Sequence, residues 1–454
     1  MSDQPSLPII AIADQGLDGA GLPAAHLAWA IANKFTGQRG KLLALPGDNG
    51  QLGGYLFGMG EARDRSPLLL GLAGANLPEG DYHLAGAYGD ATLAAVGFCL
   101  GAYRFDRYKK PTPAPRLSIP AEADAAEVER LVEAAVLARD LINTPTNDLG
   151  PDAFEAVIRT FAESRGMSFT ATVGDDLLAA NFPMIHAVGR AASQPPRLLD
   201  LSWGNPADPK VTLVGKGVTF DTGGLDIKPA AGMLLMKKDM GGAANILGLA
   251  HTIVSAGLKL RLRVLIPIVE NAIAGDSFRP GDVLTSRKGL TVEIGNTDAE
   301  GRLILADALA LADEERPELI VDMATLTGAA RVALGPELPA LFSTDDTLAR
   351  ELMAAGLLAD DPLWQLPLWA PYDAMMNSKI ADANNAASGG FAGSITAALF
   401  MRRFVTNAKA WVHLDIMAWA PEARAGRPFG GTDHGIRAVY GVLKARYPAD
   451  GSIA

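Results

Sequence analysis

The sequence of 454 residues contains a single cysteine, Cys99, and its charge is predominantly acidic. One thiol excludes an internal disulfide and any cysteine-based zinc site. The formal net charge of -11 argues against a general nucleic-acid binder. No apolar run is long enough to span a membrane, and the stretch Met1-Ser2-Asp3-Gln4 lacks the basic residues that begin a signal peptide. We therefore expect a cytoplasmic protein with no nucleic-acid partner and no membrane partner.

The length and the share of apolar residues indicate two domains. Hydrophobic residues make up 49% of the chain, which is enough for more than one core. Prolines in residues 109–115 exclude regular structure, because each removes a backbone donor. Apolar spacing predicts an amphipathic helix over residues 122–142. We therefore predict a small N-terminal α/β domain over residues 1–118, a linker helix over 119–142 and a larger C-terminal α/β domain over 143–454.

The first domain contains no cluster of acids, histidines or phosphate-binding glycines. Apolar runs predict strands at residues 8–13 and 68–72, and residues 93–103 have the spacing of a helix. A scaffold, an oligomer contact and a gate for an active site all agree with this pattern.

The second domain alternates strand and helix patterns, which predicts a mostly parallel or mixed central sheet covered by helices on both faces. The apolar runs that predict strands are residues 198–201, 211–214, 260–268, 290–294, 319–323 and 410–414. The helical patterns are residues 240–256, 303–314, 347–358 and 394–405. Ligands of such sheets bind beyond the carboxyl ends of the strands, so the chemistry is expected in the loops that follow them.

The loop after the second of these strands contains Lys216, Asp221 and Lys228 between glycines. It is not a nucleotide-binding phosphate loop, because Gly217 follows the lysine where Ser or Thr is required. Further on, Asp239 stands at the predicted start of a helix, where capping the helix is the ordinary role of an aspartate. These charged residues agree either with a tight loop around a site or with a solvated glycine hairpin.

A second charged stretch, residues 296–303, follows a predicted strand and precedes a predicted helix. Asp298, Glu300 and Arg302 alternate in it, so an extended backbone would direct all three side chains to one face. A surface ion pair is the ordinary interpretation of such a stretch taken alone.

The loops together supply four acids, which would repel one another without a cation. These acids are Asp221, Asp239, Asp298 and Glu300. Oxygen ligands without thiolates suit two hard or borderline divalent ions such as Mg, Mn or Zn. The chain contains no His-Glu-x-x-His sequence, which excludes a mononuclear zinc peptidase of that type.

The order and spacing of these motifs resemble the leucine aminopeptidases of the cytosolic, dinuclear-metal type. The matching segments are residues 214–228, 236–244, 270–283, 296–303, 322–329, 393–400 and 411–415. They cover most of the second domain, whereas the first domain matches only in size and position. The octapeptide Asn-Thr-Asp-Ala-Glu-Gly-Arg-Leu at 296–303 is the hallmark of that family.

The resemblance implies a metal-dependent aminopeptidase with two divalent ions per subunit, Zn, Mn or Mg. The more tightly held ion would be bound by Lys216, Asp221, Asp239 and Glu300. The exchangeable ion would be bound by Asp221, Glu300 and Asp298, including the Asp298 backbone carbonyl. Two such ions lower the pKa of a shared water and polarise the scissile carbonyl.

The resemblance also assigns roles outside the metal ligands. Lys228 would stabilise the developing oxyanion, and Arg302 would hold a bicarbonate that acts as the general base. The pocket for the N-terminal side chain of the peptide would be lined by Met236, Thr325 and Gly328.

The resemblance further implies peptide substrates and a homohexamer with the catalytic domains clustered inside. Met417 and Trp419 stand where the family commonly has smaller residues, which questions a leucine preference, although both also suit an apolar core. Two other functions remain as alternatives. One is a DNA-binding regulator on the same fold, which the acidic charge disfavours, and the other is a dinuclear phosphoesterase, which normally uses histidine ligands.

Overall fold

The computed structural model describes residues 6–64 and 66–449, and the chain divides into two compact units. The first unit contains the chain up to Val136 together with Leu358–Asp360 and Ala420–Gly430. The second contains Leu137–Leu357, Asp361–Trp419 and the chain from Gly431 onward. Within the described ranges, no helix is both long and apolar enough to cross a membrane.

The first unit is built around a five-stranded sheet in the order β2-β3-β1-β4-β5. Its strands are β1 (Leu7–Ala13), β2 (Leu42–Pro46), β3 (Leu52–Gly60), β4 (Gly80–Gly86) and β5 (Pro115–Ser118). Its helices are α1 (Ala24–Ala32), α2 (Gly71–Asn76), α3 (Ala91–Ala102) and the first part of α4 (Ala125–Asn143), with short 3-10 turns η1 (Asp48–Gly50) and η2 (Ala62–Asp64). Strand β1 is parallel to β3 and β4, whereas β2 is antiparallel to β3. This is the small α/β fold that the sequence predicts.

The strand predicted at residues 68–72 is wrong, whereas the predicted strand at 8–13 and helix at 93–103 are confirmed as β1 and α3. Leu68, Leu69 and Leu70 are at most 1% exposed and lie in turns that lead into α2. The N–H of Gly71 donates to the Leu68 carbonyl at 2.9 Å, as in a helical turn. A short apolar run has the same composition in a buried helical turn as in a buried strand, so the sequence does not distinguish the two.

The second unit is built around a nine-stranded sheet, and its elements follow in chain order. Its strands are β6 (Ser168–Val173), β7 (Arg197–Trp203), β8 (Lys210–Gly215), β9 (Gly217–Asp221), β10 (Arg261–Asn271), β11 (Val283–Thr285), β12 (Thr291–Glu293), β13 (Leu319–Ala324), β14 (Ala340–Ser343), β15 (Trp364–Gln365), β16 (Ala383–Asn384) and β17 (Ala410–Asp415), followed by β18 (Trp419–Ala420) and β19 (Gly430–Gly431) where the chain passes between the units. Its helices are α5 (Pro151–Ser164), α6 (Asp176–Ala179), α7 (Pro183–Gly189), α8 (Ala230–Met233), η3 (Met236–Met240), α9 (Gly241–Ser255), α10 (Glu300–Glu314), α11 (Gly328–Leu334), α12 (Asp346–Leu358), η4 (Ala370–Met376), α13 (Gly393–Arg402) and α14 (Ile436–Arg446).

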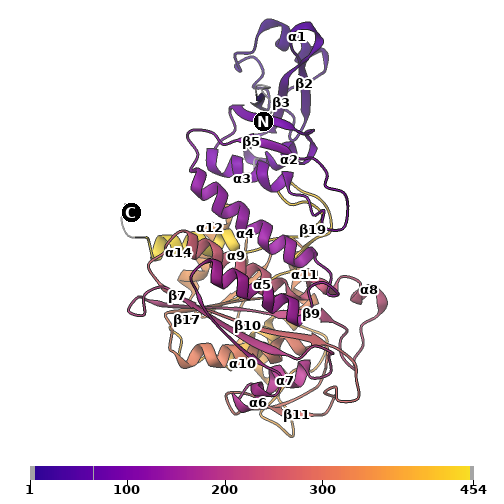
Figure 1. The fold of residues 1–454 in the computed structure, drawn as a ribbon, viewed down its shortest axis with the longest axis vertical. Helices are drawn as coiled ribbons and strands as arrows, with labels where there is room; N and C mark the ends of the chain where they lie inside the picture. The colour runs from indigo at the N-terminus through magenta and orange to yellow at the C-terminus, as the bar shows by residue number, and fades with distance from the viewer. Residues whose placement is uncertain (1–5, 65, 450–454) are drawn as a thin grey trace. The chain divides into compact units, whose positions relative to one another are not determined.

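The large sheet is mixed, with parallel strands at its centre. Its order is β15-β14-β17-β13-β8-β10-β7-β6, and β9 pairs with β10 beyond the end of β8. Strands β17, β13, β8 and β10 are mutually parallel. Strand β7 is antiparallel to both of its neighbours, whereas β14 is antiparallel to β17 and parallel to β15. Figure 1 shows α9 and α10 on opposite faces of this sheet. The mixed sheet with helices on both faces is therefore confirmed.

All six strands predicted in the second domain are present, although one belongs elsewhere. Strand β12 pairs with β11 and β16 in a separate three-stranded sheet. The helices α9, α10, α12 and α13 match the four predicted helical segments within a few residues. Helix α9 is buried along almost its whole length, which explains its nearly uniform apolar character.

Candidate metal and substrate site

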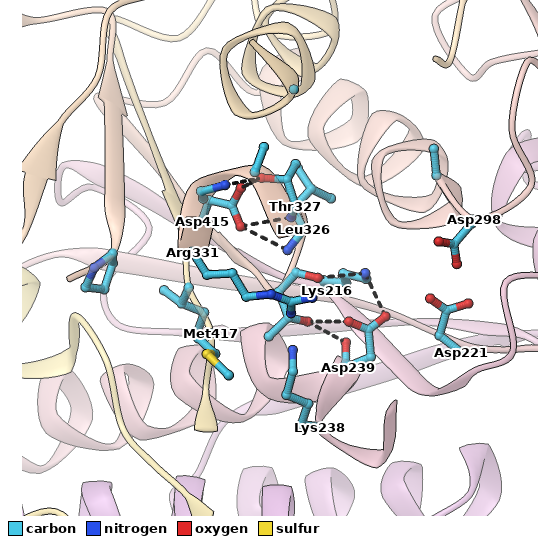
Figure 2. A pocket seen from close by; sticks show the side chains of 18 of the residues that line it. Lys216, Asp221, Lys238, Asp239, Asp298, Leu326, Thr327, Arg331, Asp415 and Met417 are labelled. Atoms are coloured by element: carbon cyan, nitrogen blue, oxygen red, sulfur yellow. Dashed lines mark hydrogen bonds and ion pairs between the residues drawn. The ribbon is translucent and has the colours of Figure 1, made fainter. Parts of the chain in front are cut away.

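The charged loops meet where the central parallel strands end. Lys216 follows β8, Asp221 ends β9, Thr325 follows β13 and Asp415 ends β17. All four residues line one cavity of about 380 Å³. Figure 2 shows the side chains of Lys216, Asp221 and Asp415 directed into the same space. This is the edge at which an open α/β sheet binds its ligands.

Carboxylates form the centre of the site. Oxygens of Asp221, Asp298 and Glu300 lie within 4.8 Å of one another. The Lys216 amine lies 2.7 Å from Oδ2 of Asp239 and 3.0 Å from Oε1 of Glu300. It also donates a hydrogen bond to a backbone carbonyl at 3.0 Å. The structure thus brings together all five residues predicted to be metal ligands.

Burial and the repulsion of neighbouring charges make Glu300 and Asp298 hard to ionise. Burial raises the pKa of Glu300 to about 8, and the Asp221 charge acts in the same direction. Burial and Asp221 likewise raise the pKa of Asp298 to about 6. For Lys216 burial alone would lower the pKa, but the charges of Asp239 and Glu300 outweigh burial and raise it.

Lys228 and Arg302 border the carboxylates from two sides. The Lys228 amine lies 2.8 Å from Oδ2 of Asp221 and also pairs with Asp298. Burial opposes its charge, but these carboxylates raise its pKa. The Arg302 side chain donates to the Asn385 carbonyl at 2.7 Å, and burial lowers its pKa to about 10.

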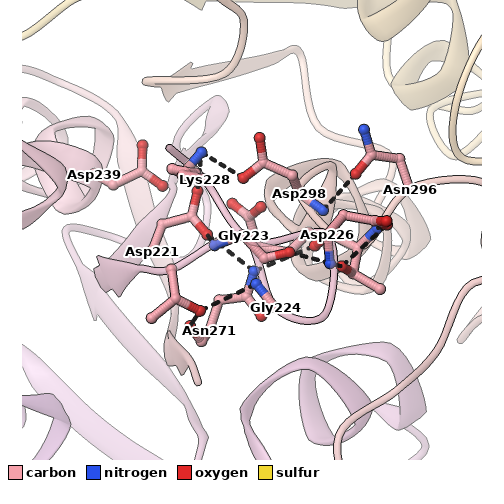
Figure 3. A network of polar contacts seen from close by, with 12 residues as sticks. Asp221, Gly223, Gly224, Asp226, Lys228, Asp239, Asn271, Asn296 and Asp298 are labelled. Atoms are coloured by element: carbon pink, nitrogen blue, oxygen red, sulfur yellow. Dashed lines mark hydrogen bonds and ion pairs between the residues drawn. The ribbon is translucent and has the colours of Figure 1, made fainter. Parts of the chain in front are cut away.

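The two charged loops are fastened to each other by hydrogen bonds (Figure 3). Asn271, at the end of β10, donates from its amide to Oδ1 of Asp221 at 2.9 Å and to the Thr297 carbonyl at 3.2 Å. The Thr297 hydroxyl donates to the Gly223 carbonyl at 2.6 Å. Gly223 has a φ of 90°, a conformation that favours glycine, and its N–H donates to Oδ1 of Asp221 at 2.8 Å. The position of Asp221 is therefore set from both loops.

Two local expectations from the sequence are wrong. Asp298, Glu300 and Arg302 do not lie along an extended segment, because α10 begins at Glu300. Asp239 does not cap helix α9, which begins after Met240 without a side-chain cap. Its carboxylate instead accepts a hydrogen bond from the Thr325 hydroxyl at 2.8 Å.

The lining of the cavity also includes the residues predicted to bind the substrate side chain. These three residues are Met236, Thr325 and Gly328, and Met417 lines the cavity as well. Trp419 is 5% exposed and does not line the cavity, so of the two departures noted in the sequence only Met417 borders the site.

Sequence reasoning missed several residues of the site. Asn271, Thr297 and Asn385 are buried and hold the loops, but an isolated polar residue in a sequence gives no signal of that role. Lys238 and Arg331 line the cavity, and burial lowers the pKa of Lys238 to about 8. The sequence could have pointed to Lys238, because it lies between two residues already assigned to the site.

The residues present suit divalent metal ions. Neither oxygen of Glu300 takes part in a hydrogen bond with any described residue, although the Lys216 amine lies 3.0 Å from Oε1. A buried, charged carboxylate is costly unless hydrogen-bond donors or cations compensate its charge. The donors are oxygens and one amine, which are ligands for hard or borderline divalent ions. The fold and the site together define an α/β enzyme with a metal-binding centre.

Comparison with known proteins identifies the family. The sequence profile of the cytosol aminopeptidase family, catalytic domain, matches residues 136–440, and that of the M17 aminopeptidase N-terminal domain matches residues 8–120. A probable cytosol aminopeptidase of Syntrophotalea carbinolica is 42% identical over 367 residues, covering 77% of this chain and 73% of that protein. One of Rhizobium rhizogenes is 43% identical over 346 residues, covering 72% and 69%.

Solved structures agree over nearly the whole chain. The crystal structure of cytosol aminopeptidase from Coxiella burnetii has a TM-score of 0.92 and 44% identity, and covers 98% of both chains. The bottromycin maturation enzyme BotP in complex with Mn has a TM-score of 0.88 and 34% identity, covering 97% of this chain and 99% of that one. The chain belongs to the cytosol aminopeptidase family and is a metal-dependent aminopeptidase.

Proposed function

We propose that the enzyme removes the N-terminal residue of peptides with two divalent ions held by Lys216, Asp221, Asp239, Asp298 and Glu300. Asp221 and Glu300 are proposed to contact both ions. When bound, such a pair supplies an activated water and a polarised scissile carbonyl. Zn, Mn and Mg all suit this donor set. The neighbour BotP, described in complex with Mn, supports a bound divalent ion in this enzyme.

The observation that carries this proposal is the state of Glu300. It is 1% exposed, and both its oxygens lack a hydrogen bond from the described residues. The Lys216 amine lies 3.0 Å from Oε1, but Oε2 has no partner among the described residues, and neighbouring metal ions would compensate it. The other carboxylates of the cluster lie close enough to share those cations.

The cations of the chain have separate proposed roles. Lys228 pairs with two of the carboxylates in the structure, and its amine would stabilise the negative charge that develops on the carbonyl oxygen. Arg302 would hold a bicarbonate as the general base, because no histidine or free carboxylate lines this part of the cavity. The Nε of Arg302 is buried and has no hydrogen-bond partner among the described residues, which supports an anion beside it.

The test compares two substitutions on the same helix. Glu300→Gln removes a proposed bridging charge, whereas Glu314→Gln changes a carboxylate at the far end of α10 that pairs with Arg287 at the surface. Metal content per subunit and hydrolysis of amino-acid anilides are measured for both. We expect Glu300→Gln to lose bound metal and about 10²-fold or more in kcat, and Glu314→Gln to lose neither. Full activity and full metal content in Glu300→Gln contradict the proposal.

The general base is tested separately with Arg302→Met. We expect kcat to fall about 10²-fold, and the dependence of wild-type activity on added bicarbonate to disappear. The assay is run in buffer stripped of carbon dioxide, with and without bicarbonate. A variant that still responds to bicarbonate as the wild type does excludes this role for Arg302.

We also propose that the enzyme works as a homohexamer in the cytoplasm. Large apolar side chains of the second unit are exposed, which supports burial in an assembly. They include Trp364, Trp369, Ile380 and Phe391, exposed by 56%, 54%, 66% and 84%. The names of the cytosol aminopeptidase relatives support the location. Light scattering should give six times the 47.4 kDa of the chain, and a monomeric mass contradicts the assembly.

A further inference from the structure

The cavity extends beyond the carboxylates to a region that two cations border. Lys238 lies on η3, between the predicted substrate-binding Met236 and the predicted metal ligand Asp239. Arg331 lies on α11, one turn after Gly328. Figure 2 shows the side chains of Lys238 and Arg331 approaching the same part of the cavity, with Met417 beside them. The region expected to receive the first side chain of a peptide is therefore not simply apolar.

The amine of Lys238 is the more informative of the two groups. The residue is only 3% exposed. Among the residues that the structure describes, none forms a hydrogen bond or ion pair with its side chain, although its backbone N–H donates to the Leu235 carbonyl. Buried charged groups are normally paired. An almost fully buried amine that faces a cavity indicates a ligand with acceptor oxygens.

Arg331 adds a second donor on the opposite side of the same region. Its side chain is exposed, and Nη2 lies 3.6 Å from the position that a Cβ on Gly328 would occupy. The guanidinium therefore extends along the wall that Gly328 leaves open. Five N–H donors in a planar group suit a carboxylate.

The acid at this end of the cavity already has donors of its own. The Asp415 carboxylate accepts hydrogen bonds from the N–H groups of Leu326 and Thr327, both at 3.1 Å. It also accepts one from the Thr327 hydroxyl at 2.6 Å. The Asp415 carboxylate thus holds the loop after β13, and we infer that Lys238 and Arg331 are available to bind a ligand.

We propose that Lys238 and Arg331 bind the side-chain carboxylate of an N-terminal Glu or Asp, so that the enzyme prefers peptides that begin with an acidic residue. This inference rests on the proposed aminopeptidase function and names its substrate class. A leucine side chain in the same place would leave the Lys238 amine buried without an acceptor, which disfavours it. Met417 also lines the cavity.

The test uses anilides of Glu, Gln and Leu with the metal-loaded enzyme. Glu and Gln differ in charge but hardly in shape, and an anilide has no C-terminal carboxylate that could bind the cations instead. We expect kcat/KM for the Glu anilide to exceed that for the Gln anilide by about 10-fold or more. Equal values for Glu and Gln in the wild type overturn the inference, whatever the variants do.

Two variants assign the preference to one side chain. Lys238→Met keeps the length of the side chain and should reduce the Glu to Gln ratio to near one, while Lys238→Arg should retain a preference for Glu. Lys237→Met is the matched control, because the Lys237 amine donates to the Asn143 carbonyl at 2.7 Å and does not line the cavity. Its Glu to Gln ratio should equal that of the wild type. A Lys238→Met enzyme with the wild-type ratio overturns the assignment.

The outcomes also separate this inference from the function on which it rests. A metal-loaded enzyme that cleaves none of the three anilides overturns the proposed function and the inference with it. An enzyme that cleaves Leu and Gln anilides as well as Glu anilide keeps the proposed function and overturns the acidic preference alone.

Discussion

A substitution at Gly301 tests the proposed metal site without changing any charged residue. It lies in the first turn of α10, directly after Glu300. A Cβ on Gly301 would lie 2.6 Å from Cε, 2.7 Å from Nζ and 2.9 Å from Cδ of Lys216. Such separations are too short for non-bonded atoms, so Gly301→Ala must displace the Lys216 side chain.

The size of the effect follows from the contacts that Lys216 makes. To reach an ordinary separation of about 3.5 Å, its end must withdraw by roughly 0.8 Å. The amine now lies 2.7 Å from Asp239 and 3.0 Å from Glu300, so this displacement disrupts both ion pairs. A misplacement of about 1 Å costs about 10²-fold in rate, and we expect a fall of that order in kcat/KM. Alanine also favours the helix by about 1 kcal/mol, so the variant should fold.

Anilide hydrolysis, metal content and thermal unfolding are measured on Gly301→Ala and on a matched control. Gly441→Ala lies on another helix, α14, where a Cβ would meet only the Cβ of Ala355 at an ordinary 3.6 Å. The control should gain about 0.5–1 kcal/mol of stability and keep the wild-type kcat. If Gly301→Ala retains both the wild-type kcat/KM and the wild-type metal content, then neither metal binding nor catalysis requires the observed position of the Lys216 amine.

Three further predictions concern the surroundings of the site. Burial raises the pKa of Asp307 from 3.8 to about 7, so the folded state favours the protonated carboxyl. The free energy of unfolding that this protonation contributes is fully present below about pH 4 and is lost as the pH rises to about 7. Relative to Asp307→Asn, which cannot ionise, the wild type should lose on the order of 3 kcal/mol in the free energy of unfolding between about pH 5 and about pH 8; a difference that is constant with pH contradicts this. Asn385→Ala should lower the free energy of unfolding by about 1–3 kcal/mol and the metal affinity about 10-fold. The reason is that the Asn385 side-chain oxygen accepts hydrogen bonds from the N–H groups of Gly295 and Asn296, at 2.8 and 3.2 Å. Metal titration and unfolding curves equal to those of the wild type contradict this role of Asn385. Chelation of the metal should lower the unfolding temperature measured by calorimetry, and adding the metal back should restore that temperature. Equal unfolding temperatures with and without metal contradict preferential binding of the metal to the folded state.

Much of the second unit could be predicted because its elements are marked by simple periodicity. The strands β8, β13 and β17 are buried on both faces and appear in the sequence as short apolar runs followed by charged loops. Since parallel strands end at the same edge, the sequence pattern predicts that Lys216 and Asp221 lie close together. Asp298 follows β12, which belongs to a separate sheet, so this argument does not place it. The order of strands in the sheet cannot be assigned in this way, because β8 and β10 are neighbours only through a crossover.

The parts that the sequence did not reveal depend on long-range contacts. Asn271 lies 26 residues before Thr297, and no local pattern indicates that its amide bridges two loops. The apolar residues Leu68–Leu70 agree equally well with a buried turn and with a buried strand. Only their packing in the folded protein decides which of the two forms. Lys238 stands beside Asp239 in the sequence, but no local pattern indicates that its side chain lines the cavity.

The cost of the carboxylate cluster explains why so many of these hidden residues surround it. Without cations the raised pKa values of Asp298 and Glu300 mean that the fold disfavours their charged forms. Hydrogen bonds from Asn271 and the Gly223 N–H hold the Asp221 carboxylate, and the Thr297 hydroxyl holds the Gly223 carbonyl beside it. Because these hydrogen bonds already fix the loops that carry the proposed metal ligands, we expect metal binding to leave the loop conformations unchanged. Residues that carry no charge and touch no substrate are for this reason as necessary to the site as its acids.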